Sequence, residues 1–144
     1  MTFTTNNIAV EISDKNGSIQ SCKVMGREIC AKTDAPCPLF SVKLLEEKGN
    51  AVYLNALNAQ SIKIEKSENG ADMKFDNLAD YEISIYASVK IVDEQLRWTV
   101  SIDNRTSIIA EWIEFPQIVV IDSFKAEGGE FELFWPLQCQ YPKA

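Results

Sequence analysis

The sequence predicts an all-β protein built as an antiparallel β-sandwich, and three observations lead to this fold class. Apolar and polar residues alternate with a period of two over long stretches, most clearly over 83–91 and 96–103. Turn-forming residues recur at a spacing of about 8–12 residues, as in sandwich folds. The sequence contains no convincing amphipathic helical pattern. Because successive side chains of a strand point to opposite faces, each alternating segment offers one apolar face to a core.

The N-terminal part predicts a hairpin. Residues 8–12 alternate, and the Asn16-Gly17 step after them supplies the positive φ that a tight hairpin turn requires. The second strand of this hairpin is expected over 18–25. It ends at a further turn over 26–28.

A loop and a second hairpin follow. Pro36 and Pro38 mark the loop, because each proline fixes its own φ and lacks an amide hydrogen. The next strand is expected over 39–45, and a turn over 46–50 leads into a strand over 51–54. The apolar face of the first of these strands consists of Phe40, Val42 and Leu44.

A third hairpin is predicted by residues 62–65 and 73–75, which alternate on either side of a turn at 67–70. The window 76–81 is the one place where a single helical turn is expected. The two long alternating strands come next, joined by a turn at 93–95.

The C-terminal part has a different pattern. Residues 106–121 carry apolar side chains on both faces, which is typical of a strand inside the sandwich or against another layer. Pro116 is expected to break or bulge the ladder of this strand. Gly128-Gly129 turns the chain into a last strand over 130–135. The whole chain therefore predicts about ten to twelve strands.

Length, composition and charge narrow the class of protein. The 144 residues predict one domain over 1–144, large enough to bury a core without metal ions or disulfides. The net charge of -7 and the lack of a basic segment argue against nucleic acid and anionic membranes as partners. No signal peptide or transmembrane segment is found, so we expect a soluble chain whose compartment the sequence leaves open.

The sequence contains no histidine. Histidine is the commonest general base near neutral pH, the usual base partner of Ser and Cys nucleophiles, and the most frequent ligand of transition metals. Carboxylate pairs such as Glu111 with Glu114 could be considered for acid–base chemistry, but 21 acidic residues make such pairs common on solvated strand faces. We therefore expect no catalytic residue, no metal site and no cofactor.

Four cysteines have spacings that match no zinc or thioredoxin-like pattern. Since a chain of this length does not need crosslinks, reduced and mostly buried thiols are expected. A disulfide between Cys30 and Cys37 is the main alternative. The four residues are Cys22, Cys30, Cys37 and Cys139.

Several short motifs together resemble a known family. They are NGSIQSCKVMGREIC (16–30), Pro38-Leu39-Phe40, LRWTVSIDN (96–104), EWIEFPQIVV (111–120) and ELFWPLQ (132–138). They resemble the N-terminal β-supersandwich domain, of galactose-mutarotase-like fold, that precedes a catalytic (β/α) barrel in large bacterial glycoside-hydrolase-like proteins. The resemblance implies that 1–144 is the N-terminal part of a longer protein, with a downstream catalytic domain as its partner.

The chain departs from this family at two points. Leu137 and Gln138 follow Pro136 where the family has a glycine. Mutarotase-like enzymes use histidine and a carboxylate, so the absence of histidine means that no such active site can be carried over. An activity is not expected for this chain alone, although the resemblance allows a glycoside hydrolase as the parent protein.

Aromatic residues are the candidates for binding, because sugar faces stack on exposed rings. Tyr86, on the polar face of its strand, and Trp135 are the candidate carbohydrate contacts, with a cross-strand pair as the alternative for Tyr86. Trp112 and Phe115 are the candidate interface residues. Trp98 alternates in phase with apolar neighbours and is expected in the core.

Three functions remain open from the sequence. The first is a non-catalytic accessory domain of a carbohydrate-active protein, which supports or extends the substrate cleft of a downstream catalytic domain. The second is an autonomous carbohydrate-binding module with an aromatic platform on one open sheet face. The third is a protein–protein interaction domain with no role in sugar binding, in which the strand over 108–121 serves as the interface.

Overall fold

The structure, a computed structural model, describes residues 1–121, and these form eleven β-strands and one short 3₁₀ helix. The strands belong to three antiparallel sheets, so the predicted all-β sandwich is confirmed. The strand expected over 130–135 lies outside the described residues. None of the helical structure within 1–121 has the length and apolar character that crossing a membrane requires.

The three sheets are named here by their strands. The N-terminal sheet has the order β1-β2-β3-β4, with β1 Thr2–Thr4, β2 Ile8–Ile12, β3 Ile19–Val24 and β4 Arg27–Glu28. The long sheet has the order β10-β9-β8-β7, with β7 Ala59–Ser67, β8 Gly70–Leu78, β9 Ile83–Val92 and β10 Gln95–Asn104. The small sheet has the order β11-β5-β6, with β5 Ser41–Leu45, β6 Ala51–Asn55 and β11 Ile109–Glu114.

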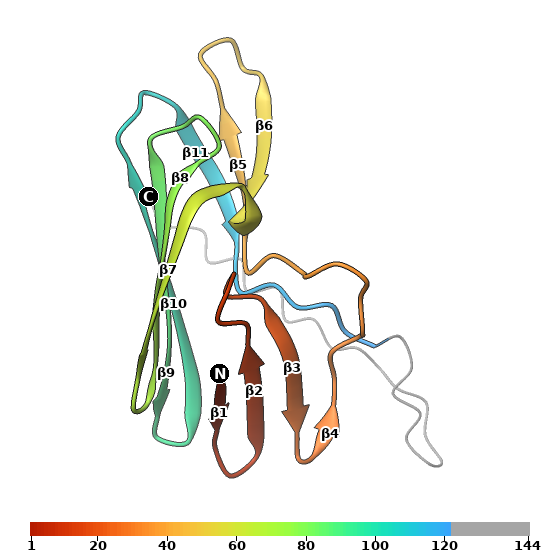
Figure 1. Ribbon diagram of the computed structural model, residues 1–144. Helices are drawn as coiled ribbons and strands as arrows, with labels where there is room; N and C mark the ends of the chain where they lie inside the picture. Colours follow the sequence, from red (N-terminus) through yellow and green to blue (C-terminus); the bar gives the residue numbers. More distant parts are fainter. Residues whose placement is uncertain (122–144) are drawn as a thin grey trace, which may run out of the picture.

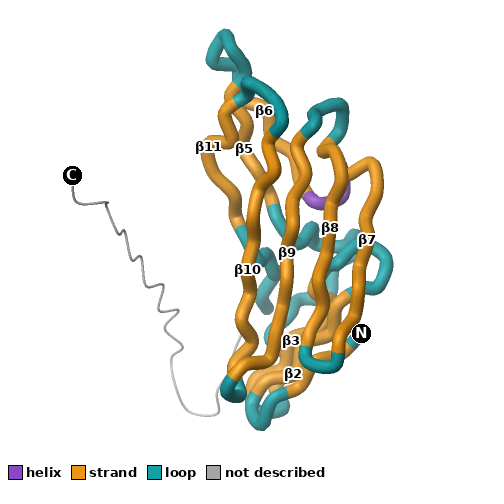
Figure 2. Tube along the Cα trace, turned by 90° about the vertical axis from the view of Figure 1, so that its left-hand side faces the viewer, coloured by secondary structure: helices purple, strands orange, loops and turns teal. Residues whose placement is uncertain are grey.

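The sheets form two layers. The long sheet makes one layer, and the small sheet and the N-terminal sheet lie one above the other in the second layer (Figure 1). A view turned by 90° shows the same arrangement, with the long sheet in front of both other sheets (Figure 2). One face of the long sheet is therefore covered by the second layer, and the opposite face is its outer face.

The core lies between the layers and comes from the alternation that the sequence shows. On β9, Ile83, Ile85, Ala87 and Val89 are buried, and on β8 the buried side chains are Ala71, Met73, Phe75 and Leu78. The facing layer contributes Phe40, Val42 and Leu44, as predicted. Phe40 and Phe75 meet edge to face with ring centroids 5.0 Å apart, which joins the two layers.

The turns explain how the hairpins hold their register. β9 and β10 pair from Gln95–Val92 to Asn104–Ile83, and the two residues between them, Asp93 and Glu94, have φ values of 51° and 61°. Two consecutive left-handed residues are the mark of a type I′ turn, whose twist suits a hairpin. Gly17 also has the predicted positive φ, at 73°.

Two expectations are corrected by the structure. β8 continues as a strand through Leu78, so the helical turn expected over 76–81 is wrong. The helical turn is instead η1, Ala56–Asn58, where the side chain of Asn55 accepts a hydrogen bond from the Leu57 amide and Asn58 caps the Asn55 amide. Buried Phe75 and Leu78 hold the 76–78 segment in the sheet instead.

The strand over 106–121 is also different from the prediction that it is interior. Only Ile109–Glu114 is a strand, and within the described residues it pairs with β5 alone, at the edge of the small sheet. Both of its faces carry apolar side chains. One face packs against the core, whereas on the other face the side chains of Ile109 and Trp112 point outward and are 62% and 36% exposed. The strand ends before Pro116, as expected from its missing amide hydrogen.

Candidate functional site

The outer face of the long sheet carries two polar rows that cross all four strands. The first row is Lys63, Lys74, Tyr86 and Ser101, which are direct cross-strand partners from β7 to β10. The second row, one step of the pleat away, is Glu65, Asp72, Ser88 and Thr99. Residues two apart on a strand share a face, so the two rows form one continuous polar surface.

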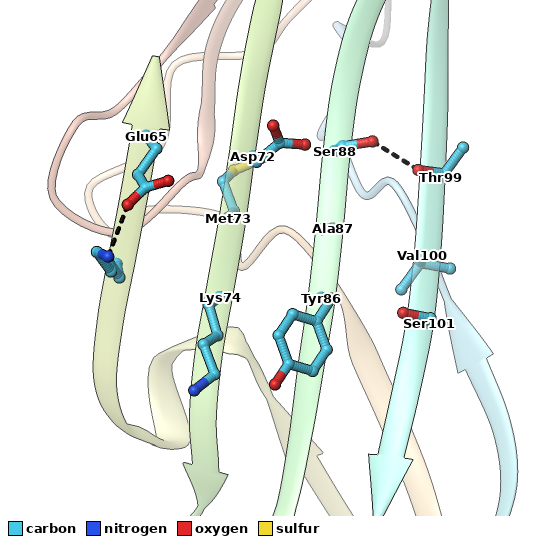
Figure 3. Close-up of a pocket in the computed structure, with 11 residues that line it drawn as sticks. Glu65, Asp72, Met73, Lys74, Tyr86, Ala87, Ser88, Thr99, Val100 and Ser101 are labelled. Atoms are coloured by element: carbon cyan, nitrogen blue, oxygen red, sulfur yellow. Dashed lines mark hydrogen bonds and ion pairs between the residues drawn. The ribbon is translucent and has the colours of Figure 1, made fainter. Parts of the chain in front are cut away.

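This surface is hollowed between the rows. A shallow pocket of about 430 Å³ is lined by both rows and lies within the size range of small-molecule sites. Figure 3 shows Lys74 and Tyr86 side by side on neighbouring strands, with the hydrogen-bonded pair of Ser88 and Thr99 further along the strands. We call this pocket and its two rows the Tyr86 face.

Tyr86 is the one aromatic ring in the lining of this pocket. It is 41% exposed, and the ammonium of Lys74 lies 5.7 Å from its ring centroid, within the range of a cation–π contact. The sequence interpretation that Tyr86 is an exposed aromatic is therefore correct. The predicted alternative, a cross-strand pair, also holds, because Lys74 is its direct partner on β8.

The charged groups of the Tyr86 face are paired, either within the face or with a neighbouring residue of the long sheet. Lys74 binds Asp76 at 2.8 Å, so the carboxylate raises the pKa of Lys74 and the ammonium lowers the pKa of Asp76. Lys63 binds Glu65 at 2.6 Å and lowers the pKa of that carboxylate. Lys74, Asp76 and Glu65 therefore stay ionised near neutral pH, each beside an opposite charge, so the face suits a neutral, hydroxyl-rich ligand.

The hydroxyl groups of the face are also close together. The side-chain oxygens of Ser88 and Thr99 are 2.6 Å apart and share one hydrogen bond. Each hydroxyl keeps further capacity to donate or accept, and Ser101 adds a third hydroxyl at the neighbouring position of β10. The face thus offers an aromatic ring, ammonium donors, carboxylate acceptors and hydroxyls within one hollow.

Several carboxylates outside the Tyr86 face bind structural partners. Glu28 accepts hydrogen bonds from the amides of Cys22 and Cys30 at 2.9 and 3.0 Å and from the hydroxyl of Ser21. Burial raises its pKa, but these hydrogen bonds outweigh that effect and leave the pKa below its usual value. Glu111 binds Lys43 at 2.6 Å, and Glu114 accepts from Gln117 at 2.8 Å.

The thiols within residues 1–121 are free, and Cys22 and Cys37 are half-buried, so the predicted burial holds fully only for Cys30. Cys30 is buried, and burial raises its pKa to about 11. Burial also raises the pKa of Cys22 and of Cys37. These thiols are therefore protonated at neutral pH and are poor nucleophiles. Cys139 lies outside the described residues.

The other aromatic candidates are separated from the Tyr86 face. Trp98 packs against the core and meets Phe115 edge to face, with ring centroids 5.9 Å apart. Phe115 is therefore partly buried against the core, and its role as an interface residue stays a prediction. Trp135 lies outside the described residues.

Trp112 belongs to a second exposed surface, the outer face of the small sheet. Its ring is tilted against that of Tyr53, with centroids 6.2 Å apart, and both are cross-strand partners of Lys43. Tyr53 is 65% exposed, and Ile109 extends the apolar surface along β11. Sequence reasoning missed Tyr53, although Val52 and Leu54 on either side of it alternate with it and indicate that it points outward.

Comparison with known proteins adds no relative to this picture. No protein-family model, curated protein or solved structure matches the chain. The resemblance to supersandwich domains of glycoside-hydrolase-like proteins thus stays a prediction, and function has to be inferred from the surfaces of the molecule.

Proposed function

We propose that this chain is a non-catalytic accessory domain that binds carbohydrate on the Tyr86 face. The observation that carries the proposal is the exposed ring of Tyr86 in a hollow lined by paired charges and hydroxyls. A pyranose ring has apolar C–H faces and an equatorial rim of hydroxyls. It can therefore place one face on the Tyr86 ring while its rim exchanges hydrogen bonds with the surrounding side chains.

The shape of the surface also supports binding rather than catalysis. The two rows run straight across four strands of a sheet, so an extended chain of sugar residues can lie along them without entering a deep cavity. Rigid strands position the side chains before the ligand arrives, which lowers the entropic cost of binding.

Replacement of Tyr86 tests this proposal directly. After a glycan array has identified a bound oligosaccharide, Tyr86→Ala is expected to weaken its Kd by about 30-fold, since loss of a central aromatic contact costs about 2 kcal/mol. Isothermal titration calorimetry with that oligosaccharide measures the change. Tyr86→Phe keeps the ring and is expected to retain most of the affinity.

Tyr53→Ala is the matched control, because Tyr53 is also exposed but lies on the small sheet. It is expected to leave the Kd unchanged. The proposal fails when no oligosaccharide on the array binds the chain, or when Tyr86→Ala binds as tightly as the unchanged protein.

A second function, docking of a downstream catalytic domain, is favoured by the outer face of the small sheet. Tyr53, Ile109 and Trp112 make an exposed apolar surface there, and the Lys43–Glu111 ion pair lies within it. Exposed apolar patches rich in aromatic residues mark protein interfaces. This surface fits the accessory role, in which the domain extends the cleft of a catalytic partner.

Comparison of the chain 1–144 with a longer protein from the same reading frame tests the docking function. Where the native frame continues past Ala144, β6 and β11 are expected to exchange amide hydrogens more slowly in the longer protein than in the chain 1–144. Tyr53→Ala together with Trp112→Ala is expected to remove this added protection. Equal exchange of β6 and β11 in the two proteins would contradict the docking function and leave the sugar proposal untouched.

A further inference from the structure

A groove opens at one side of the sandwich, between β10 of the long sheet and the β2–β3 hairpin of the N-terminal sheet. It has a volume of about 470 Å³, and most of its lining is apolar. The apolar side chains are Ile8, Val10, Ile19, Cys22, Val24, Leu96, Trp98, Pro116 and Ile118. These residues come from both layers, so the groove is a part of the interlayer space that the described residues leave uncovered.

The strand beside the groove has a free edge. Within residues 1–121, β10 pairs only with β9, over ten residue pairs, and its other edge carries backbone groups without a strand partner. A long strand with an open edge next to an apolar groove can accept an extended segment, whose main chain adds to the sheet and whose alternate side chains enter the groove.

The chain itself leaves close to this groove. Pro116 and Ile118 line it, and the Ile121 amide donates to the carbonyl of Ile29 at 3.0 Å. Cys30 and Val120 form an antiparallel bridge, which fixes the exit of the chain beside the N-terminal sheet. Eight residues lie between 121 and 130, and the nine Cα–Cα steps can span about 30 Å when extended.

The sequence beyond this exit has the pattern that the groove requires. Phe131, Leu133 and Trp135 alternate with Glu130, Glu132 and Phe134. As a strand, such a segment places three large apolar side chains on one side, and two carboxylates and Phe134 on the other.

We propose that the groove is the docking surface for residues 130–137 of the same chain, which add to the free edge of β10 and fill the groove with Phe131, Leu133 and Trp135. The contact closes the open side of the sandwich between β10 and β3. It is independent of sugar binding, because the groove and the Tyr86 face share no lining residue.

Cys22 gives a native probe of this contact, because it lines the groove and is half-buried there. Iodoacetamide labelling at pH 8.5 followed by tryptic digestion reports each thiol separately, since Cys22, Cys30 and Cys37 fall in the peptides 16–23, 28–32 and 33–43. Cys37 lies outside the groove and Cys30 is buried, so they report general exposure and unfolding.

The variant Phe131→Ser/Leu133→Ser/Trp135→Ser in the full chain is expected to increase the labelling rate of Cys22 by about tenfold, because the cover of the groove opens. The labelling of Cys30 and Cys37 stays unchanged. The matched control, Glu130→Ser/Glu132→Ser, alters the same segment on its other side and is expected to keep Cys22 protected.

When Cys30 stays protected, the variant is folded, and either of two results then overturns the proposal. The first is equal labelling of Cys22 in the unchanged chain and the triple variant. The second is protection of Cys22 that disappears on dilution, which assigns the groove to a second copy of the chain.

Rapid labelling of Cys30 in the triple variant means that this variant has unfolded. In that case, hydrogen exchange of the unchanged chain decides whether residues 130–137 dock on β10. The amides of β10 that do not bond to β9 are slow to exchange when the segment docks, and exchange as free edge amides when it does not.

Discussion

Phe75→Ala is expected to lower the free energy of unfolding by about 4 kcal/mol, among the largest effects of any single core substitution. The ring of Phe75 is completely buried and meets Phe40 across the two layers. It also lies against the β2–β3 turn, where a Cβ added to Gly17 would be 3.2 Å from Cζ of Phe75. The side chain therefore contacts both sheets of the second layer, and its removal leaves a cavity where all three sheets meet.

Urea denaturation monitored by far-UV circular dichroism measures this effect, because the shift of the midpoint at constant m-value gives the loss of stability. Phe75→Leu keeps most of the volume and is expected to cost only about 1.5 kcal/mol. A loss below about 1 kcal/mol for Phe75→Ala would contradict the described packing of the two layers.

The same substitution connects the core to the Tyr86 face. Phe75 lies between Lys74 and Asp76 on β8, and these two neighbours point to the outer face, where they form their ion pair. A strand that shifts to fill a cavity on its inner side moves the side chains on its outer side as well. The polar rows of the Tyr86 face therefore depend on the interlayer core for their geometry.

The alternation of residues was sufficient to predict the strands of the long sheet and their buried faces. Ile83, Ile85 and Val89 alternate with polar residues in the sequence and are fully buried in the structure. Tyr86 follows from the same rule as an outward residue, because it is out of phase with these positions. Local patterns succeed here because the period of two is fixed by the geometry of a single strand.

The grouping of residues into a site required information that a single strand does not contain. Tyr86 meets Lys74 and Ser101 because three strands are aligned in one register. A shift of one residue in any pairing would move its partners to the opposite face. The two-residue turn at Asp93 and Glu94 fixes one of these registers, yet neither residue is the glycine or asparagine that usually indicates such a turn.

The strand β11 shows a second limit of sequence patterns. Apolar residues on both faces of a strand indicate burial on both faces only when the outer face is not itself an exposed apolar interface. Here Ala110 and Ile113 pack against the core, whereas Trp112 and Ile109 form an exposed apolar surface. The pattern alone cannot distinguish an interior strand from an edge strand that carries an interface.

Gly70→Ala is expected to destabilise the protein by about 3 kcal/mol, although the substitution adds a single methyl group. Gly70 begins β8 and pairs with Lys90, and a Cβ at this position would lie 2.1 Å from the carbonyl oxygen of Val89. That atom belongs to the backbone of β9, so a flexible side chain cannot relieve the overlap. The ladder between β8 and β9 has to move instead.

The position of Gly70 makes this movement costly. The Ile91 amide donates to the carbonyl of Asn69 at 2.8 Å, so the β8–β9 ladder continues into the turn that Gly70 follows. Val89 is fully buried in the core, which resists displacement of β9 toward the second layer. The methyl group therefore separates the ends of two central strands of the long sheet.

Urea denaturation of Gly70→Ala, with Ser67→Ala as the control, measures the expected loss. Ser67 is the exposed cross-strand partner of Gly70 on β7, and its substitution is expected to change the stability by less than about 0.5 kcal/mol. Equal midpoints for the two variants would show that β8 and β9 are not packed so closely at Gly70.

Asp72 and Ser88 lie two residues along these strands and belong to the Tyr86 face. Separation of the strands at Gly70 is therefore expected to weaken glycan binding as well as stability.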